Sequence, residues 1–191
     1  MALLLVSFAG MAQDGAKARP SLGIRAGYNL SGIYEFMEFK SDDGMEWKSG
    51  VNLGVVADFA LSEKFLFRPG LYYSMKGFKD DGSGSKFSYN YLEAPLLAVY
   101  QHPLGESLKL DLQLGPYLGI GVGGKSEIGG LPEFDTFGGD DGEGRFDWGL
   151  NIGCGLQLGK IYAGVSFEDG FVSYGHQSKH HCLMLDLGYT F

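Results

Sequence analysis

Residues 145–158, RFDWGLNIGCGLQL, decide the fold, because large apolar residues occupy every second position from Phe146 to Leu158. Glycine, amide and acidic residues such as Asp147, Asn151 and Gln157 fill the positions between them. Successive side chains of a β-strand point to opposite faces of a sheet. The pattern therefore predicts a strand with one apolar face and one small or polar face.

The same alternation recurs along the chain. It is clear in Leu108–Val122 and weaker in Phe87–Gln101, where Leu96 to Val99 are consecutive apolar residues. The predicted strands are Ser21–Ile33, Val51–Leu61, Leu66–Gly77, Phe87–Gln101, Leu108–Val122, Arg145–Leu158, Ile161–Asp169 and His181–Phe191. A set of about eight strands, an even number, suits a closed antiparallel up-and-down barrel.

The predicted connections alternate in length. Short turns are expected at Ser62–Lys64, His102–Ser107 and Gly159–Lys160, and long loops at Tyr34–Gly50, Phe78–Lys86, Lys125–Gly144 and Gly170–His180. Membrane barrels of the bacterial outer membrane have short periplasmic turns and long external loops. The pattern predicts an eight-stranded transmembrane barrel in the cell outer membrane with both mature termini in the periplasm.

Composition agrees with this fold class and excludes others. The chain is 45% hydrophobic and contains 32 glycines, a load that a helical bundle does not tolerate. Its mean hydropathy is -0.03, so apolar and polar residues are interleaved rather than gathered into long runs. The net charge of -8 argues against a nucleic-acid partner, because phosphate binding needs clustered Lys and Arg.

The two faces of the predicted strands differ in charge. Charged residues of both signs occupy the small face and are predicted to form a charge network in the lumen: Arg25, Asp58, Arg68, Lys76, Glu93, Lys109, Asp111, Asp147, Glu168 and Asp186. Such residues can pair across a small lumen, so the apolar face is expected to contact lipid. Aromatic residues near the strand ends are expected to form interfacial girdles: Tyr28, Phe59, Phe67, Tyr100, Phe146, Trp148, Tyr189 and Phe191.

The N-terminus divides into two short segments before the barrel. Residues 1–12, MALLLVSFAGMA, form a short apolar run that ends in small residues, as in a secretory signal peptide. Residues 13–20 are a polar linker, and the barrel domain covers residues 21–191.

Candidate reactive residues are few, and no catalytic, cofactor-binding or metal site is predicted. Cys154 and Cys182 fall on predicted strands six and eight, and their side chains are expected to point to opposite faces of the sheet. This arrangement argues against a disulfide. His176, His180 and His181 cluster near the last external loop, where imidazoles could bind a metal or activate Ser166, Ser173 or Ser178. The acidic runs at residues 42–43, 80–81 and 140–143 lack the ligand spacing of a calcium loop.

Several segments together resemble the outer-membrane β-barrel family of Bacteroidetes that is labelled PorT-like. They are GIRAGYNLSGI, FRPGLYYSMKGF, YNYLEAPLLAVY, GPYLGIGVGG, FDWGLNIGCGLQLG and the terminal LDLGYTF. The ending with Tyr189 and Phe191 is similar to the signature that the outer-membrane insertion machinery recognises, which implies this machinery as a partner. The resemblance implies location more than activity.

The expected function is that of an integral outer-membrane β-barrel protein with a structural or surface-interaction role, and no catalysis is expected. Outer-membrane lipids are the expected partners, and a monomer is the expected state. Two alternatives stay open, a lipid-modifying enzyme and a barrel component of a protein secretion system. A soluble ligand-binding barrel would need the reverse polarity of its two faces.

Overall fold

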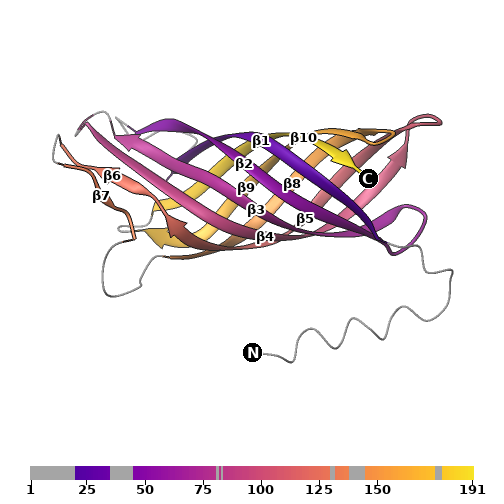
Figure 1. The fold of residues 1–191 in the computed structure, drawn as a ribbon, viewed down its shortest axis with the longest axis horizontal. Coiled ribbons are helices and arrows are strands. Elements are labelled where there is room, and N and C mark those ends of the chain that lie inside the picture. Colours follow the sequence, from indigo (N-terminus) through magenta and orange to yellow (C-terminus); the bar gives the residue numbers. More distant parts are fainter. Residues whose placement is uncertain are drawn as a thin grey trace, which may run out of the picture.

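The computed structural model describes residues 20–34, 45–80, 82, 84–129, 132–137, 145–174 and 178–191. Within these ranges, eight long strands form a closed antiparallel barrel (Figure 1). Their bounds are β1 Ser21–Tyr34, β2 Met45–Ala60, β3 Phe65–Asp80, β4 Ser85–Pro103, β5 Leu108–Gly123, β8 Phe146–Leu158, β9 Ile161–Tyr174 and β10 Ser178–Thr190. The part of the chain described here contains no helix with the length and apolarity needed to cross a membrane.

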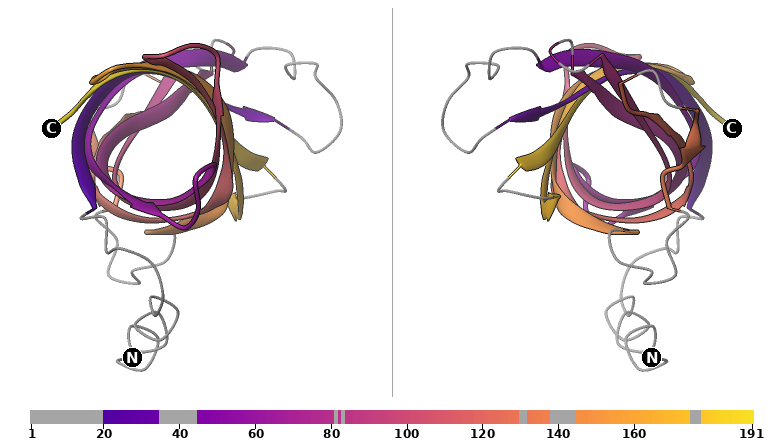
Figure 2. Two further views of the ribbon diagram at one scale, coloured as in Figure 1. Left: turned by 90° about the vertical axis from the view of Figure 1, so that its right-hand side faces the viewer. Right: turned by 90° about the vertical axis from the view of Figure 1, so that its left-hand side faces the viewer.

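Each long strand pairs with the next one along the chain, and pairing of β1 with β10 closes the ring. The closing register aligns Gly23 with Thr190 and Leu30 with Leu183. Views along the axis show the resulting ring of strands (Figure 2). Closure leaves the eight long strands without an unpaired edge, which removes a template for aggregation.

The two ends of the barrel differ. One end, called the turn end here, carries the connections at 61–64, 104–107 and 159–160, together with the start of β1 and the C-terminal Phe191. The tight turn after β8 uses Gly159 at a φ of 55°, a left-handed conformation that glycine adopts without a steric penalty. The opposite end, called the loop end, carries the longer connections.

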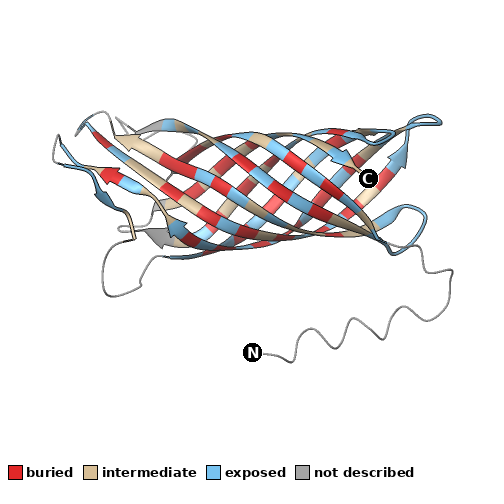
Figure 3. Cartoon of the chain, in the orientation of Figure 1, coloured by how far each residue is buried: buried red, intermediate tan, exposed pale blue. Residues whose placement is uncertain are grey.

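Burial alternates along the strands as the sequence predicts (Figure 3). In β8, Asp147 and Asn151 are buried whereas Leu150 and Ile152 are exposed. The buried set lines the lumen and the exposed set forms the outer wall. The core of this protein is therefore the barrel interior, and its outer surface is apolar.

The strands are longer at the loop end than the sequence predicts. The second strand begins at Met45 rather than Val51, and β9 continues to Tyr174 rather than Asp169. Parts of the predicted loops Tyr34–Gly50, Phe78–Lys86 and Gly170–His180 are therefore strand. A strand needs only about 9–11 residues to span a bilayer. Beyond the lipid the backbone pairing between strands continues, but no lipid is present to require that apolar and polar residues alternate. The sequence pattern therefore ends before the strand does.

The predicted loop Lys125–Gly144 also contains unexpected structure. A short hairpin of β6, Lys125–Glu127, and β7, Phe134–Asp135, extends the sheet at the loop end. It pairs with the beginning of β4 through Lys86 with Glu127 and Phe87 with Ser126. The predicted signal peptide at 1–12 and residues 13–19 of the predicted linker lie outside the described residues.

Candidate functional site

The lumen near the turn end holds a cluster centred on Arg68 of β3. Its guanidinium, 1% exposed, donates from Nε and Nη2 to the two carboxylate oxygens of Asp58 at 2.5 and 2.9 Å. Nη2 also lies 2.9 Å from Oδ2 of Asp111, whose Oδ1 accepts a hydrogen bond from Gln101. One buried cation thus holds carboxylates of two different strands, β2 and β5, in fixed positions. Bidentate pairing of this kind suits the planar fork of arginine.

A second cluster crosses the other half of the lumen and is centred on Lys76 of β3. Its ammonium group forms ion pairs with Glu93 of β4 and with Glu168 of β9, the latter at 2.6 Å. Glu168 also accepts a hydrogen bond of 3.1 Å from Asn151 of β8. These contacts connect opposite sides of the wall and stabilise the closed ring.

Aromatic side chains fill much of the remaining lumen. The guanidinium carbon of Arg25 lies 3.4 Å from the centroid of the Tyr162 ring, a cation–π contact. The Tyr162 ring in turn covers Gly155 and Gly164, where a Cβ atom would overlap it. Toward the loop end, the Tyr117 hydroxyl donates to Asp147 at 3.0 Å. The glycines of the small face therefore provide the space that these rings occupy.

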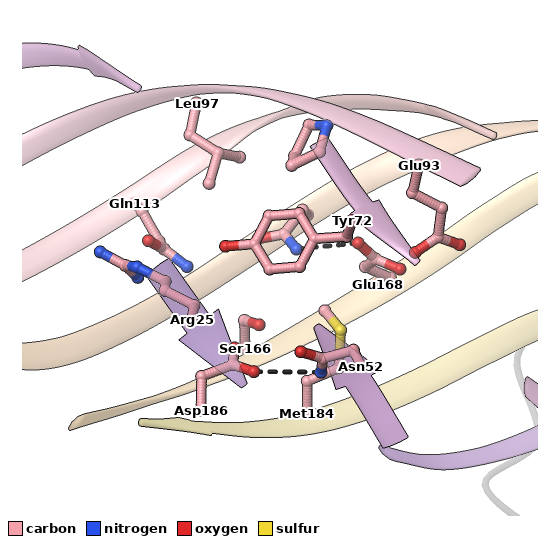
Figure 4. Close-up of a pocket in the computed structure, with 12 residues that line it drawn as sticks. Arg25, Asn52, Tyr72, Glu93, Leu97, Gln113, Ser166, Glu168, Met184 and Asp186 are labelled. Atoms are coloured by element: carbon pink, nitrogen blue, oxygen red, sulfur yellow. Dashed lines mark hydrogen bonds between the residues drawn. The ribbon is translucent and has the colours of Figure 1, made fainter. Parts of the chain in front are cut away.

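A small cavity lies between these groups, near the middle of the barrel (Figure 4). Its volume is about 20 Å³, and its lining includes Arg25, Glu93, Glu168 and Asp186. A volume of this size accommodates about one water molecule. The lumen is thus a packed interior, as expected for an eight-stranded barrel, rather than an aqueous channel.

Nine residues of the predicted charge network lie inside the barrel, and the tenth lies at its turn-end mouth. Arg25, Arg68, Lys76, Glu93, Asp111, Asp147 and Glu168 are buried, and Asp58 and Asp186 are half-buried beside them. Lys109 is exposed at the turn end, with Nζ 3.5 Å from Oε1 of Gln101. Its long side chain reaches the mouth of the barrel, where water solvates the ammonium group.

Sequence reasoning missed several lumen residues. Tyr72, Tyr91 and Tyr162 point inward with the charged residues, and so does Asn52. Their position in the alternation, the same as that of neighbouring Glu93 or Glu168, was the available signal. The consecutive apolar residues of β4 also divide between the faces. Leu97 and Val99 are buried inside, whereas Leu96 is exposed on the wall.

The aromatic residues of the outer wall gather at both ends. At the turn end, rings form the pairs Phe59–Phe67, Phe65–Tyr100 and Tyr189–Phe191, with centroids 6.4, 5.3 and 5.7 Å apart. At the loop end, Trp148 packs edge-on against Phe171 at 5.0 Å. Tyr28 and Phe146 are also exposed on the wall. This is the distribution of interfacial aromatic belts.

His180 and His181, the two described histidines of the predicted cluster, lie on opposite faces of the wall and do not share a site. His180 is buried in the lumen, edge-on to Tyr89 at 5.1 Å. His181 lies on the outer wall, with Nδ1 3.1 Å from Oδ1 of Asp169 and its ring stacked on Phe167. His176 lies outside the described residues, as do residues 42–43, 81 and 140–143 of the acidic runs. Among the residues that are described, no group of three or more His, Cys, Asp or Glu could hold a metal ion.

Of the candidate nucleophiles, Ser166 is separated from His181 by the wall. Ser166 is buried inside the barrel, on the opposite side of the wall from His181. The side chains of Ser173 and Ser178 lie outside the described set. Cys154 is exposed on the wall and Cys182 is buried in the lumen, and both are free thiols on strands that β9 separates.

A closed eight-stranded barrel with an apolar outer wall and an ion-paired lumen is the architecture of an integral outer-membrane protein. The chain belongs to the outer membrane protein β-barrel domain family, whose model matches residues 11–174. It is therefore an outer-membrane protein. A comparison with curated proteins found no match.

Solved structures share the fold at low sequence identity. Ail of Yersinia pestis, crystallised with the heparin analogue sucrose octasulfate, is 20% identical with a TM-score of 0.50, over 91% of this chain and all of that one. Neisserial surface protein A is 12% identical with a TM-score of 0.53, over 89% of this chain and 97% of that one. These likenesses concern the fold.

Proposed function

We propose that this protein is a non-catalytic barrel that anchors a binding surface at its loop end. The observation that carries the proposal is the hairpin β6–β7, which extends the wall at the loop end of a barrel whose lumen is already filled. Phe137, directly after β7, packs over Gly121 and lies edge-on to Tyr89 and Tyr91 at 5.8 and 6.0 Å. This apolar contact holds the end of the hairpin against the inner side of the wall.

Polar contacts fix the same hairpin. The hydroxyl of Thr136 donates to the carbonyl of Ser88 at 2.9 Å, and Nη2 of Arg145 donates to the carbonyl of Phe137 at 2.6 Å. A segment that is held in one conformation loses little further entropy when it binds a partner. Together with the extended ends of β2, β3 and β4, it supplies a preorganised surface for interaction.

The test compares cells that display the full chain with cells that display a variant in which residues 125–137 are replaced by a Gly-Ser linker. Both would be assayed for adhesion to panels of immobilised proteins and polysaccharides, after heat-modified electrophoresis has established that both barrels are folded. We expect adhesion to the full chain and its loss in the variant. Equal adhesion by the two strains, or adhesion by neither, would reject the proposal.

One observation favours an enzyme as the second candidate. The pair of His181 and Asp169 lies on the outer wall near the loop end, where it could reach lipid headgroups. A carboxylate that orients an imidazole is a common part of hydrolytic sites. Release of fatty acid from outer-membrane lipid by the purified chain, abolished by His181→Ala and retained by His102→Ala, would establish this function instead.

The proposal also includes the orientation of the barrel in the membrane and the subgroup to which the protein belongs. The short turns support an orientation in which the turn end is periplasmic. The motifs quoted above support a place in the PorT-like subgroup of Bacteroidetes. For a member of that subgroup, a role in protein secretion is the alternative function. Trypsin added to intact cells should cleave at loop-end lysines such as Lys86 and Lys125, which are exposed. Protection of both would reverse the orientation.

Lipids and the insertion machinery are the proposed partners of a monomeric barrel. Phe191 is 66% exposed; its backbone N–H donates to the carbonyl of Leu22, and its ring packs edge-on against Tyr189. We expect deletion of Phe191 to leave protein in the periplasm while changing the stability of the refolded barrel little. Normal outer-membrane yield without Phe191 would contradict recognition of this residue.

A further inference from the structure

The cavity at the centre of the lumen has an excess of negative charge. Three carboxylates line it, those of Glu93, Glu168 and Asp186. Two cations serve them, because Arg25 also lines the cavity and Lys76 is shared between Glu93 and Glu168. A charge that is removed from water without a partner is strongly destabilising. One further positive charge would neutralise this group.

Two amide oxygens of the same cavity lack hydrogen-bond donors. Asn52 and Asn151 are each 3% exposed, and both line the cavity. The amide nitrogen of Asn52 donates to Asp186 at 3.0 Å and that of Asn151 donates to Glu168 at 3.1 Å. The carbonyl oxygen Oδ1 of each has no hydrogen-bond partner in the structure. Buried acceptors of this kind normally have a partner.

We propose that the cavity binds one monovalent alkali cation, with sodium as the expected ion. A volume of about 20 Å³ fits one water-sized particle. A water molecule could donate to the two amide oxygens but would leave the excess charge, whereas a cation satisfies the oxygens and the charge together. Carbonyl oxygens replace the hydration shell of alkali cations in selective ion sites.

The chemistry of the lining argues against other metals. A calcium ion takes six to eight oxygen ligands, and its two charges exceed the single negative charge that this cavity leaves uncompensated. Zinc prefers thiolate and imidazole ligands. The residues that line the cavity include no histidine or cysteine. Neutral oxygens from Asn52 and Asn151, with carboxylates around them, suit a singly charged ion. The inference is independent of any role of the loop end.

The test measures thermal unfolding of the full chain in detergent micelles. Sodium chloride would be exchanged for N-methylglucamine chloride at constant ionic strength, so that screening does not change. We expect the unfolding temperature to rise with the logarithm of sodium concentration once the site begins to fill, as ligand linkage requires. Broadening of the sodium-23 NMR signal by the unmodified protein, saturable with added sodium, would provide a second measurement that needs no variant.

Matched variants locate the site. Asn151→Leu removes an amide oxygen from the cavity, and Asn90→Leu removes an amide oxygen that also lacks a partner but does not line the cavity. We expect the sodium response to disappear in the first variant and to persist in the second. Equal loss in both variants, a response to calcium but not sodium, or no sodium effect on either measurement would overturn the proposal.

Discussion

At the scale of a residue, the outer wall places each apolar side chain at a defined depth in the bilayer. Ile152 lies in the middle of β8, is 55% exposed, and is flanked by Leu114 and Phe167 on the neighbouring strands. We expect Ile152→Arg to lower the free energy of unfolding in lipid by about 2–4 kcal/mol, because the charge would lie near the midplane. Equilibrium unfolding in urea with vesicles would measure it.

Leu158→Arg is the matched control for this prediction. Leu158 is 56% exposed on the same face of the same strand, but it is the last residue of β8 at the turn end. A charge near the interface should cost only about 0–1 kcal/mol. Equal effects of the two substitutions would contradict the assigned wall.

Removal of a buried cation from the lumen should reduce the stability of the barrel more than removal of a cation from its surface. Lys76→Met should lower the free energy of unfolding by about 3–5 kcal/mol, because Glu93 and Glu168 lose their shared partner while remaining buried. The comparison is Lys86→Met. Lys86 is 59% exposed and lies 3.8 Å from Glu127, so its loss should change stability by less than about 1 kcal/mol. Similar losses from the two substitutions in urea titrations would refute the lumen pairing.

At the scale of an element, the sequence predicts which residues of a strand face the lumen. It does not predict which of these residues pair across the lumen. The alternation of apolar and polar residues could be recognised because one face of each strand contacts lipid and the other contacts packed polar groups. Each face therefore requires its own type of residue at every second position. The pairing of Lys76 with Glu168 joins residues 92 positions apart on β3 and β9. It depends on the stagger between strands, which the local pattern does not encode. The hairpin β6–β7 was missed because two- and three-residue strands are too short to show a period.

The packing of β8 against β9 gives a prediction at this scale. Tyr162 lies over Gly155 and Gly164 on these two strands, and it is held from the other side by Arg25. We expect Gly155→Ala to lower the free energy of unfolding by about 1–3 kcal/mol, because the methyl group would displace a ring that has no free space. Gly105→Ala in the turn after β4, where no atom lies within 4 Å of the added carbon, should be close to neutral. Thermal unfolding of both variants in the same detergent would show the difference.

At the scale of the whole molecule, the lumen determines what the barrel can transport. Ion-paired clusters around Arg68 and Lys76 cross the interior at two levels, and Phe137 packs over Gly121 near the loop end. The cavity between the clusters has a volume of only about 20 Å³. Water and ions would have to break several buried ion pairs to pass.

We therefore expect planar-bilayer recordings of the purified chain to show no stable open channel at moderate voltage and physiological salt. An eight-stranded barrel has an interior only wide enough for its own side chains, whereas porins with 16 to 18 strands conduct through a water-filled channel and provide the positive control. Reproducible single-channel steps would contradict the packed lumen. The double substitution Arg68→Ala with Lys76→Ala offers a further check, since it removes both central cations and should increase leak current if these clusters are the barrier. If a folded double variant shows no increase in leak current, the barrier is formed instead by the aromatic residues around Tyr117 and Tyr162. The side chains of these two tyrosines are only 1% and 2% exposed.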